Sequence, residues 1–178
     1  IGWGCPEYGR LRKVLMQPPG EELDLVTPVT YRKFLFEDAV DPNEFRKQHE
    51  NFVNVLKSEG VDVILLGKIL ENRAIENSMR RSPNLVYTRD TVSVTPSGFI
   101  KMRMKNLARR KEPSIVEEAL RQLSVPELVS IEWPATMEGG DLIFLDEDTL
   151  LLGVGNRTNR AGLRKLCRTA VETGLSTL

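Results

Sequence analysis

Cysteine and histidine are scarce in this sequence of 178 residues, which contains two cysteines and one histidine. Cys5 and Cys167 are too few for a disulfide framework, and neither belongs to a Cys-x-x-Cys motif or a Cys/His cluster. With His49 as its one histidine, the chain is not expected to hold a structural zinc ion. So few cysteines fit a reducing compartment, and we expect the protein to be cytoplasmic.

The chain also lacks an excess of charge of either sign. It has 25 lysines and arginines and 25 aspartates and glutamates, and its aromatic content is 6%. Nucleic-acid binders usually show a basic excess and stacking aromatics, so we expect no nucleic-acid partner, although the basic stretch at residues 101–111 is a candidate surface. No run of about 18 apolar residues predicts a membrane span. Residues 1–5 lack a signal-peptide pattern, and without a starting Met we expect the N-terminus to be missing or processed.

What the sequence does contain is the balance of a globular domain, with 40% hydrophobic and 28% charged residues. Its length suffices for one domain with a sizeable core. The apolar period changes repeatedly between two and about 3.6 residues, which indicates strands and helices in succession. We predict strands or hairpins at residues 11–17, 61–66, 91–94 with 99–102, 128–131 and 142–145 with 150–152, and helices at 42–58, 69–78, 113–123 and 159–173.

The helix at residues 42–58 has the clearest boundaries. Asp41 suits the N-cap, Pro42 the first helical position, Glu44 has capping-box spacing, and Gly60 ends the helix. Strand pairs joined by tight turns exclude a purely parallel sheet, so the predicted class is α/β with mixed and antiparallel strands. No strand follows Gly174, and the chain ends as though cut.

Two groups of charged residues stand in apolar surroundings. Arg89 and Asp90 interrupt a run of strand formers, and a buried charge is costly unless it is paired. One interpretation is an intramolecular ion pair at a strand end; the other places Asp90 in a pocket that faces a cationic ligand. Glu138 and Asp141 flank two glycines, where they form either a solvated turn or a site with a base and a hydrogen-bond acceptor.

Two arginines follow these acids at the same distance. Arg109 lies nineteen residues after Asp90, and Arg157 lies nineteen residues after Glu138. A guanidinium can bind a carboxylate through two parallel hydrogen bonds. Acids that bind the cationic end of a ligand and arginines that bind its acidic end would therefore suit a zwitterionic amino acid. The alternative is a basic, solvated face, and we prefer it for Arg110 and Lys111.

Four segments in register resemble the arginine deiminase family. They are residues 84–90 (NLVYTRD), 108–112 (ARRKE), 137–141 (MEGGD) and 153–158 (GVGNRT). Residues 8–15 and 36–38 are similar to its opening strand and to the segment before its first long helix. The resemblance places the chain in the guanidine-modifying (pentein) superfamily, which includes dimethylarginine hydrolases and amidinotransferases.

The resemblance also implies a fold, an α/β propeller of five pseudo-repeated units. This chain would supply about three of them as a single catalytic-type domain over residues 1–178, truncated at its C-terminus. Arginine deiminases commonly insert a helical domain before the Arg-Asp motif. Only residues 67–83 separate the second strand from that motif here, so the insertion is expected to be absent.

The resemblance assigns roles position by position. Asp90 and Glu138 would be catalytic residues that bind the substrate guanidinium, and Glu138 would assist proton transfer. The α-carboxylate and neighbouring polar atoms would be held by Asn84, Arg109 and Arg157, while Asp141 would support the site. The implied reaction converts L-arginine to citrulline and ammonia through a cysteine thiouronium intermediate, without a metal or an organic cofactor. The partner is therefore a small guanidine compound, and a homo-oligomer is left open.

The chain departs from the family's pattern at the nucleophile. The family's Cys and His lie in later segments, and no cysteine or histidine of this chain matches them. Cys167 is predicted to be a small core residue, and His49 a partly buried packing residue on the apolar face of its helix. We therefore expect no turnover by these 178 residues alone.

Three alternatives stay open. Within the superfamily, the protein would be a dimethylarginine hydrolase or an amidinotransferase. Outside it, the chain would be a non-catalytic module that binds arginine, or a nucleic-acid binder that uses residues 101–111. Gly153 and Gly155 do not begin a dinucleotide-binding loop, because Thr158 stands where a third glycine belongs.

Overall fold

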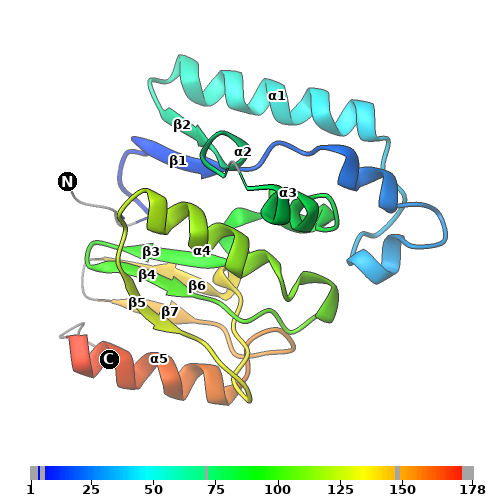
Figure 1. Ribbon diagram of the computed structural model, residues 1–178. Coiled ribbons are helices and arrows are strands. Elements are labelled where there is room, and N and C mark those ends of the chain that lie inside the picture. Colours follow the sequence, from blue (N-terminus) through cyan, green and yellow to red (C-terminus); the bar gives the residue numbers. More distant parts are fainter. Residues whose placement is uncertain (1–3, 5–6, 71, 147–148, 174–178) are drawn as a thin grey trace. The chain divides into compact units, whose positions relative to one another are not determined.

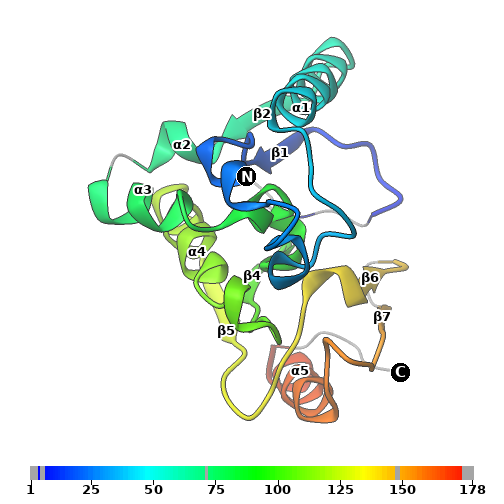
Figure 2. The same ribbon diagram turned by 90° about the vertical axis from the view of Figure 1, so that its right-hand side faces the viewer.

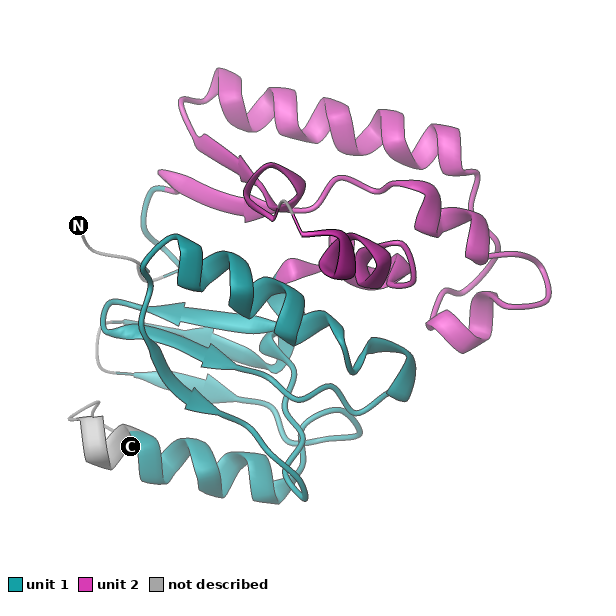
Figure 3. Ribbon diagram, viewed as in Figure 1, with its two compact units in different colours: residues 1–10, 89–178 teal, residues 11–88 magenta. Residues whose placement is uncertain are grey.

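The computed structural model, shown in Figures 1 and 2, describes residues 4, 7–70, 72–146 and 149–173. The chain forms two compact units, coloured in Figure 3. One unit comprises residues 11–88, and the other comprises residues 1–10 and 89–178. The sequence-based assignment of residues 1–178 to a single domain stays a prediction.

The unit of residues 11–88 is built on a parallel strand pair. β1 (Lys13–Met16) pairs with β2 (Asp62–Leu65), and the long helix α1 (Pro42–Ser58) is the crossover between them (Figure 1). A parallel pair needs such a crossover because its strands run in the same direction. Both strands lie inside the ranges predicted for them from the apolar pattern.

Helix α1 begins and ends where the sequence predicts. The Asp41 carboxylate accepts hydrogen bonds from the backbone N–H groups of Asn43 and Glu44, at 2.8 and 3.2 Å. These bonds satisfy two donors that the first turn of a helix leaves open. Beyond the last turn, Gly60 has φ +78°, a conformation that favours glycine. His49 is buried on this helix, which confirms its prediction as a packing residue.

Two short helices follow β2 where a single helix was predicted. α2 (Leu66–Ile69) begins directly after the strand, and α3 (Arg73–Met79) begins after Asn72. The Asn72 side chain accepts from Ala74 N–H at 2.9 Å and so starts a new helix. The helix predicted over residues 69–78 was therefore wrong at its start, because Ile69 ends α2, while α3 confirms its later part. Short 3₁₀ turns complete this unit at Glu21–Leu25, Tyr31–Phe34 and Pro83–Val86.

The second unit contains a mixed sheet of three strands. β3 (Val92–Thr95) and β4 (Gly98–Lys101) form an antiparallel hairpin, and β5 (Glu127–Ser130) joins β4 in parallel. The chain reaches β5 through helix α4 (Glu112–Gln122), which packs against β3 and β4. These elements confirm the predicted α/β class with mixed strands, while its division into propeller units stays a prediction.

A second hairpin and the last described helix complete this unit. β6 (Leu142–Phe144) and β7 (Leu150–Leu152) pair antiparallel, and α5 (Arg160–Thr173) lies on the side of the sheet away from α4 (Figures 1 and 2). The core of this unit is apolar and draws on strands, loops and α5. Its buried members are Ile100, Met102, Met104, Val129, Ile131, Ala135, Met137, Leu142 and Leu166.

One prediction about α5 was wrong. Cys167 is exposed, whereas its neighbour Leu166 is buried in the core. Successive helical residues point about 100° apart, so the buried stripe that includes Leu166 leaves position 167 outside it. Cys5 and the chain end from Gly174 onward lie outside the described residues. None of the helices in the described ranges has the length and apolar character needed to cross a membrane.

Candidate active site

The two acids and two arginines with nineteen-residue spacing belong to one unit. Asp90 directly precedes the β3 region, and Arg109 lies in the 3₁₀ turn Leu107–Arg109 after β4. Glu138 precedes the turn Gly139–Asp141, and Arg157 follows β7. All four side chains therefore stand in the connections next to strands, where a rigid sheet fixes the ends of short loops.

The first acid is paired with the first arginine. Arg109 Nη1 donates to Asp90 Oδ2 at 2.7 Å, and Arg109 Nε donates to Glu112 Oε2 at 2.8 Å. The Arg109 side chain is only 4% exposed. Burial alone would lower the pKa of Arg109, but the carboxylates of Glu112 and Asp90 raise it above its ordinary value. Arg109 is therefore a fixed cation between two acids.

Glu112 is a buried acid to which the sequence patterns assigned no role. It is fully buried at the start of α4, and its Oε1 has no hydrogen-bond partner among the described residues. Burial raises the pKa of Glu112 to about 7; Arg109 opposes that change, whereas the charges of Asp90 and Glu138 add to it. Three acids thus act on one another here. The sequence signal was its position three residues after Arg109, which also fits an ordinary first-turn acid.

The second acid is paired with the second arginine. Arg157 Nη1 donates to Glu138 Oε2 at 2.9 Å. The other oxygen, Oε1, accepts from the backbone N–H of Lys105 at 3.2 Å. The Glu138 side chain is 7% exposed, whereas that of Arg157 is 41% exposed. A carboxylate with little access to water is therefore balanced by a cation that reaches solvent.

The glycine pair after Glu138 brings the two acidic segments together. A Cβ atom at Gly139 would stand 2.0 Å from the carbonyl oxygen of Arg89. A Cβ atom at Gly140 would stand 3.0 Å from Asp90 Oδ1. Gly139 therefore permits close contact between two stretches of backbone, and Gly140 keeps the space beside the Asp90 carboxylate clear.

Asp141 acts on the site through Thr158. The Thr158 hydroxyl donates to Asp141 Oδ2 at 2.6 Å and accepts from the backbone N–H of Glu138 at 3.1 Å. Thr158 is fully buried. Because Thr158 follows Arg157 directly, this chain of hydrogen bonds holds the backbone at both members of the Glu138–Arg157 pair.

Neighbouring charges have other partners. Arg89 donates to Glu7 at 2.7 Å and to the carbonyl oxygen of Leu142 at 2.8 Å, whereas the adjacent Asp90 accepts from Arg109. Arg110 donates to the carbonyl oxygens of Met104 and Lys105, which corrects its prediction as a simply solvated residue.

Asn84 belongs to the other unit. It is buried in the 3₁₀ turn Pro83–Val86. Its predicted role beside the acids of residues 89–178 stays a prediction. In the part of the chain that the structure describes, no group of three or more His, Cys, Asp or Glu side chains is arranged to hold a metal ion.

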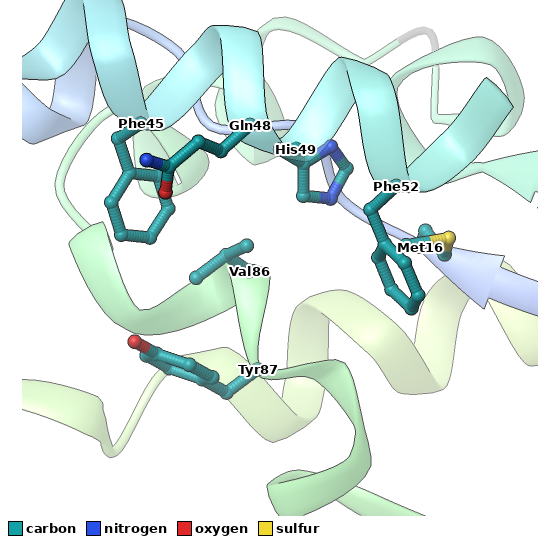
Figure 4. A pocket seen from close by; sticks show the side chains of 7 residues that line it. All are labelled: Met16, Phe45, Gln48, His49, Phe52, Val86 and Tyr87. Carbon is teal, nitrogen blue, oxygen red and sulfur yellow. The ribbon is translucent and has the colours of Figure 1, made fainter. Parts of the chain in front are cut away.

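A separate pocket of about 270 Å³ lies in the unit of residues 11–88 (Figure 4). Its walls are mainly apolar and aromatic, and they are formed by Met16, Phe45, Gln48, His49, Phe52, Val86 and Tyr87. Burial lowers the pKa of His49, which keeps this imidazole neutral near pH 7. The lining contains no acid, so the pocket offers apolar contact and cannot balance a guanidinium.

Two comparisons with known sequences point to the same family. A sequence profile of the family described as arginine deiminase matches residues 32–82 and 75–177. An arginine deiminase from Borreliella burgdorferi is 26% identical over 233 residues, which cover 90% of this chain and 57% of that protein. The chain thus spans about three fifths of the length of the curated relatives it matches.

Solved structures give the same superfamily. A mutant dimethylarginine dimethylaminohydrolase from Pseudomonas aeruginosa, complexed with citrulline, has a TM-score of 0.75 and 25% identity, covering 96% of this chain and 60% of that one. A dimethylarginine dimethylaminohydrolase adduct with S-methyl-L-thiocitrulline has a TM-score of 0.73 and 26% identity, covering 94% and 60%.

Proposed function

This chain belongs to the arginine deiminase family, and from that membership we propose that it supplies the substrate-binding half of an active site that hydrolyses L-arginine to citrulline and ammonia. The observation that carries the proposal is the state of its two acids. Asp90 and Glu138 each accept a hydrogen bond from a guanidinium group, at 2.7 and 2.9 Å. Each carboxylate thus already binds a guanidinium group of the protein, which supports their proposed role in holding the guanidinium of the substrate.

The proposed reaction proceeds in two steps. A cysteine thiolate attacks the guanidinium carbon, and ammonia leaves after its nitrogen is protonated. Water then adds to the thiouronium carbon, the carbon–sulfur bond breaks, and citrulline is released. Asp90 and Glu138 hold the planar cation during both steps, and Glu138 assists proton transfer. Holding the reacting carbon in one place lowers the entropic part of the barrier.

We place the nucleophilic cysteine and the proton-transferring histidine outside these 178 residues. Cys167 is exposed on α5, next to the buried Leu166 of the core. His49 lies in an apolar pocket whose lining has no acid. The lining around His49 contains no acid that could orient its imidazole, and the sequence has no second histidine that could act as a base for Cys167.

The remaining roles follow from charge. Arg109 and Arg157 are the cations that would hold the α-carboxylate, with Asn84 for a neighbouring polar atom. Asp141 supports the site through Thr158, whose hydroxyl also accepts from Glu138 N–H. The substrate is thus a zwitterionic amino acid with a cationic side chain.

We also propose that the chain is about three fifths of a five-unit propeller without a helical insertion. The alignment with the Borreliella burgdorferi protein is 233 residues long but uses only 90% of this 178-residue chain. That relative therefore contains residues inside the matched region that this chain lacks, which supports a compact form.

A second candidate is the hydrolysis of dimethylarginine. It is favoured by the two dimethylarginine dimethylaminohydrolase structures, whose TM-scores are 0.75 and 0.73. The two reactions share citrulline as a product and differ in the amine released. The test incubates the full-length protein with L-arginine and, separately, with asymmetric dimethylarginine, and measures ammonia, dimethylamine and citrulline. Ammonia with citrulline from L-arginine supports the proposal, and dimethylamine alone would replace it with the second candidate.

A non-catalytic module is the outcome to expect if neither amine is released. Calorimetry with L-arginine then decides the matter, because binding without any product identifies an arginine-binding protein. Absence of both binding and turnover in the full-length protein would overturn the guanidine site itself.

A further inference from the structure

The two arginines of the site are held very differently. Arg109 is 4% exposed and donates to two carboxylates, Asp90 and Glu112. Arg157 is 41% exposed and donates to Glu138 through Nη1. A cation held at two points inside the protein stays in place, whereas one that is half in water loses little hydration when it moves.

Resting on the function proposed above, we infer that Arg157 is an exchangeable occupant of the Glu138 carboxylate, which a substrate guanidinium displaces while the α-carboxylate of the substrate receives Arg157. Before binding, Arg157 Nη1 occupies Glu138 Oε2 at 2.9 Å, the acceptor that the substrate needs. The second oxygen of Glu138 keeps its hydrogen bond from Lys105 N–H, so the acceptor stays in position during the exchange.

The charge balance of this exchange determines which ligands bind. L-Arginine breaks one ion pair and forms two, because it brings a guanidinium for Glu138 and a carboxylate for Arg157. Agmatine, which is arginine without its carboxylate, breaks one pair and forms only one. A ligand with a carboxylate and no cation would leave Glu138, which is 7% exposed, without a cationic partner inside the protein. The exchange therefore selects ligands that carry both charges.

Arg157 is thus a specificity-determining residue in two senses. It attracts the carboxylate of the correct ligand, and it competes with the guanidinium of an incorrect one. The second effect separates this inference from a simple carboxylate anchor. An anchor has no influence on a ligand without a carboxylate, whereas a competitor weakens the binding of such a ligand.

The test compares the affinities of L-arginine and agmatine for the full-length protein and its Arg157→Ala variant, measured by calorimetry or as KM and inhibition constants. We expect Arg157→Ala to weaken the binding of L-arginine by about tenfold or more and to strengthen the binding of agmatine by about fivefold or more. Unchanged or weaker agmatine binding in this variant would overturn the exchange.

Two controls isolate the effect. Arg160→Ala removes the same charge three residues away, from an exposed position at the start of α5, and should leave agmatine binding within about twofold of wild type. An equal gain in both variants would mean general electrostatics and would contradict the exchange. Glu138→Gln should weaken both ligands; retained agmatine affinity would also contradict it. If the wild-type protein binds neither ligand, the proposed function fails first, and that result is distinct from L-arginine binding with an unchanged agmatine response.

Discussion

Glu138 Oε2 and Arg157 Nη1 lie 2.9 Å apart and are separated by nineteen positions, the same separation that joins Asp90 to Arg109. In both pairs the acid precedes the arginine, and a hairpin lies between them in the chain. Each hairpin returns the chain close to its starting point, so the second residue meets the first. The same local geometry thus produces a carboxylate–guanidinium pair twice within one unit.

The acid of the first pair should matter for chemistry more than the arginine of the second. Asp90→Ala removes a partner of the substrate guanidinium, and we expect kcat/KM for L-arginine to fall by about 1,000-fold. Arg157→Ala should mainly raise KM, by about tenfold or more, because the carboxylate contact lies away from the reacting carbon. Steady-state kinetics of the full-length protein measure both. Equal and small effects of the two substitutions would count against this assignment of roles.

The sequence predicted those elements of the fold that are determined by residues close together in the chain. Helix α1 has the predicted limits because Asp41 and Pro42 act on its first turn and Gly60 acts at its end, each over a short distance in the chain. The hairpins were found because a short turn joins neighbouring strands. The break between α2 and α3 was missed, because Asn72 competes with the helix pattern only through its side-chain bond to Ala74 N–H.

The site was predicted less completely because its contacts join residues far apart in the chain. Spacing and charge identified Asp90, Arg109, Glu138 and Arg157 as a set, but they did not say that the acids and arginines pair with each other. Glu112 was missed because an acid in the first turn of a helix is ordinarily a solvated, dipole-stabilising residue. Its burial depends on how α4 packs against the sheet, which no local pattern records.

The backbone contact at Gly139 should make this position intolerant of any side chain. A Cβ atom there would stand 2.0 Å from the Arg89 carbonyl oxygen, so one of the two segments must move. We expect Gly139→Ala to lower the free energy of unfolding by about 3 kcal/mol and to reduce arginine turnover, because the movement separates Glu138 from Asp90. Urea denaturation measures the first effect and steady-state kinetics the second.

Gly155→Ala is the matched control for this substitution. A Cβ atom at Gly155 would meet no described atom within 4 Å, so the variant should unfold within about 0.5 kcal/mol of wild type. Similar stability of the two variants would show that the close contact at Gly139 is relieved without cost.

The hydroxyl of Thr158 should contribute strongly to the free energy of unfolding. It donates to Asp141 at 2.6 Å and accepts from Glu138 N–H at 3.1 Å, so Thr158→Val leaves the partly buried Asp141 carboxylate and the buried Glu138 N–H without this partner. We expect a loss of about 2–4 kcal/mol in the free energy of unfolding. Thr158→Ser keeps the hydroxyl and should recover most of it, and failure of serine to do so would assign the loss to the methyl group instead.

Glu112 should make the stability of the protein depend on pH near neutrality. Burial raises the pKa of Glu112 from its ordinary value of 4.5 to about 7 in the folded protein. An acid with a raised pKa favours the folded state when it is protonated, so its stabilising contribution is complete below about pH 4.5 and is lost as the pH rises through about 7. Glutamine resembles the protonated acid and does not titrate. The free energy of unfolding of Glu112→Gln relative to wild type should therefore increase between pH 5 and pH 8, by about 2–3 kcal/mol. Urea denaturation at both pH values measures this change, with Glu118→Gln, an acid on the same helix, as the control. A constant difference between Glu112→Gln and wild type across this range would mean that Glu112 remains ionised beside Arg109 throughout.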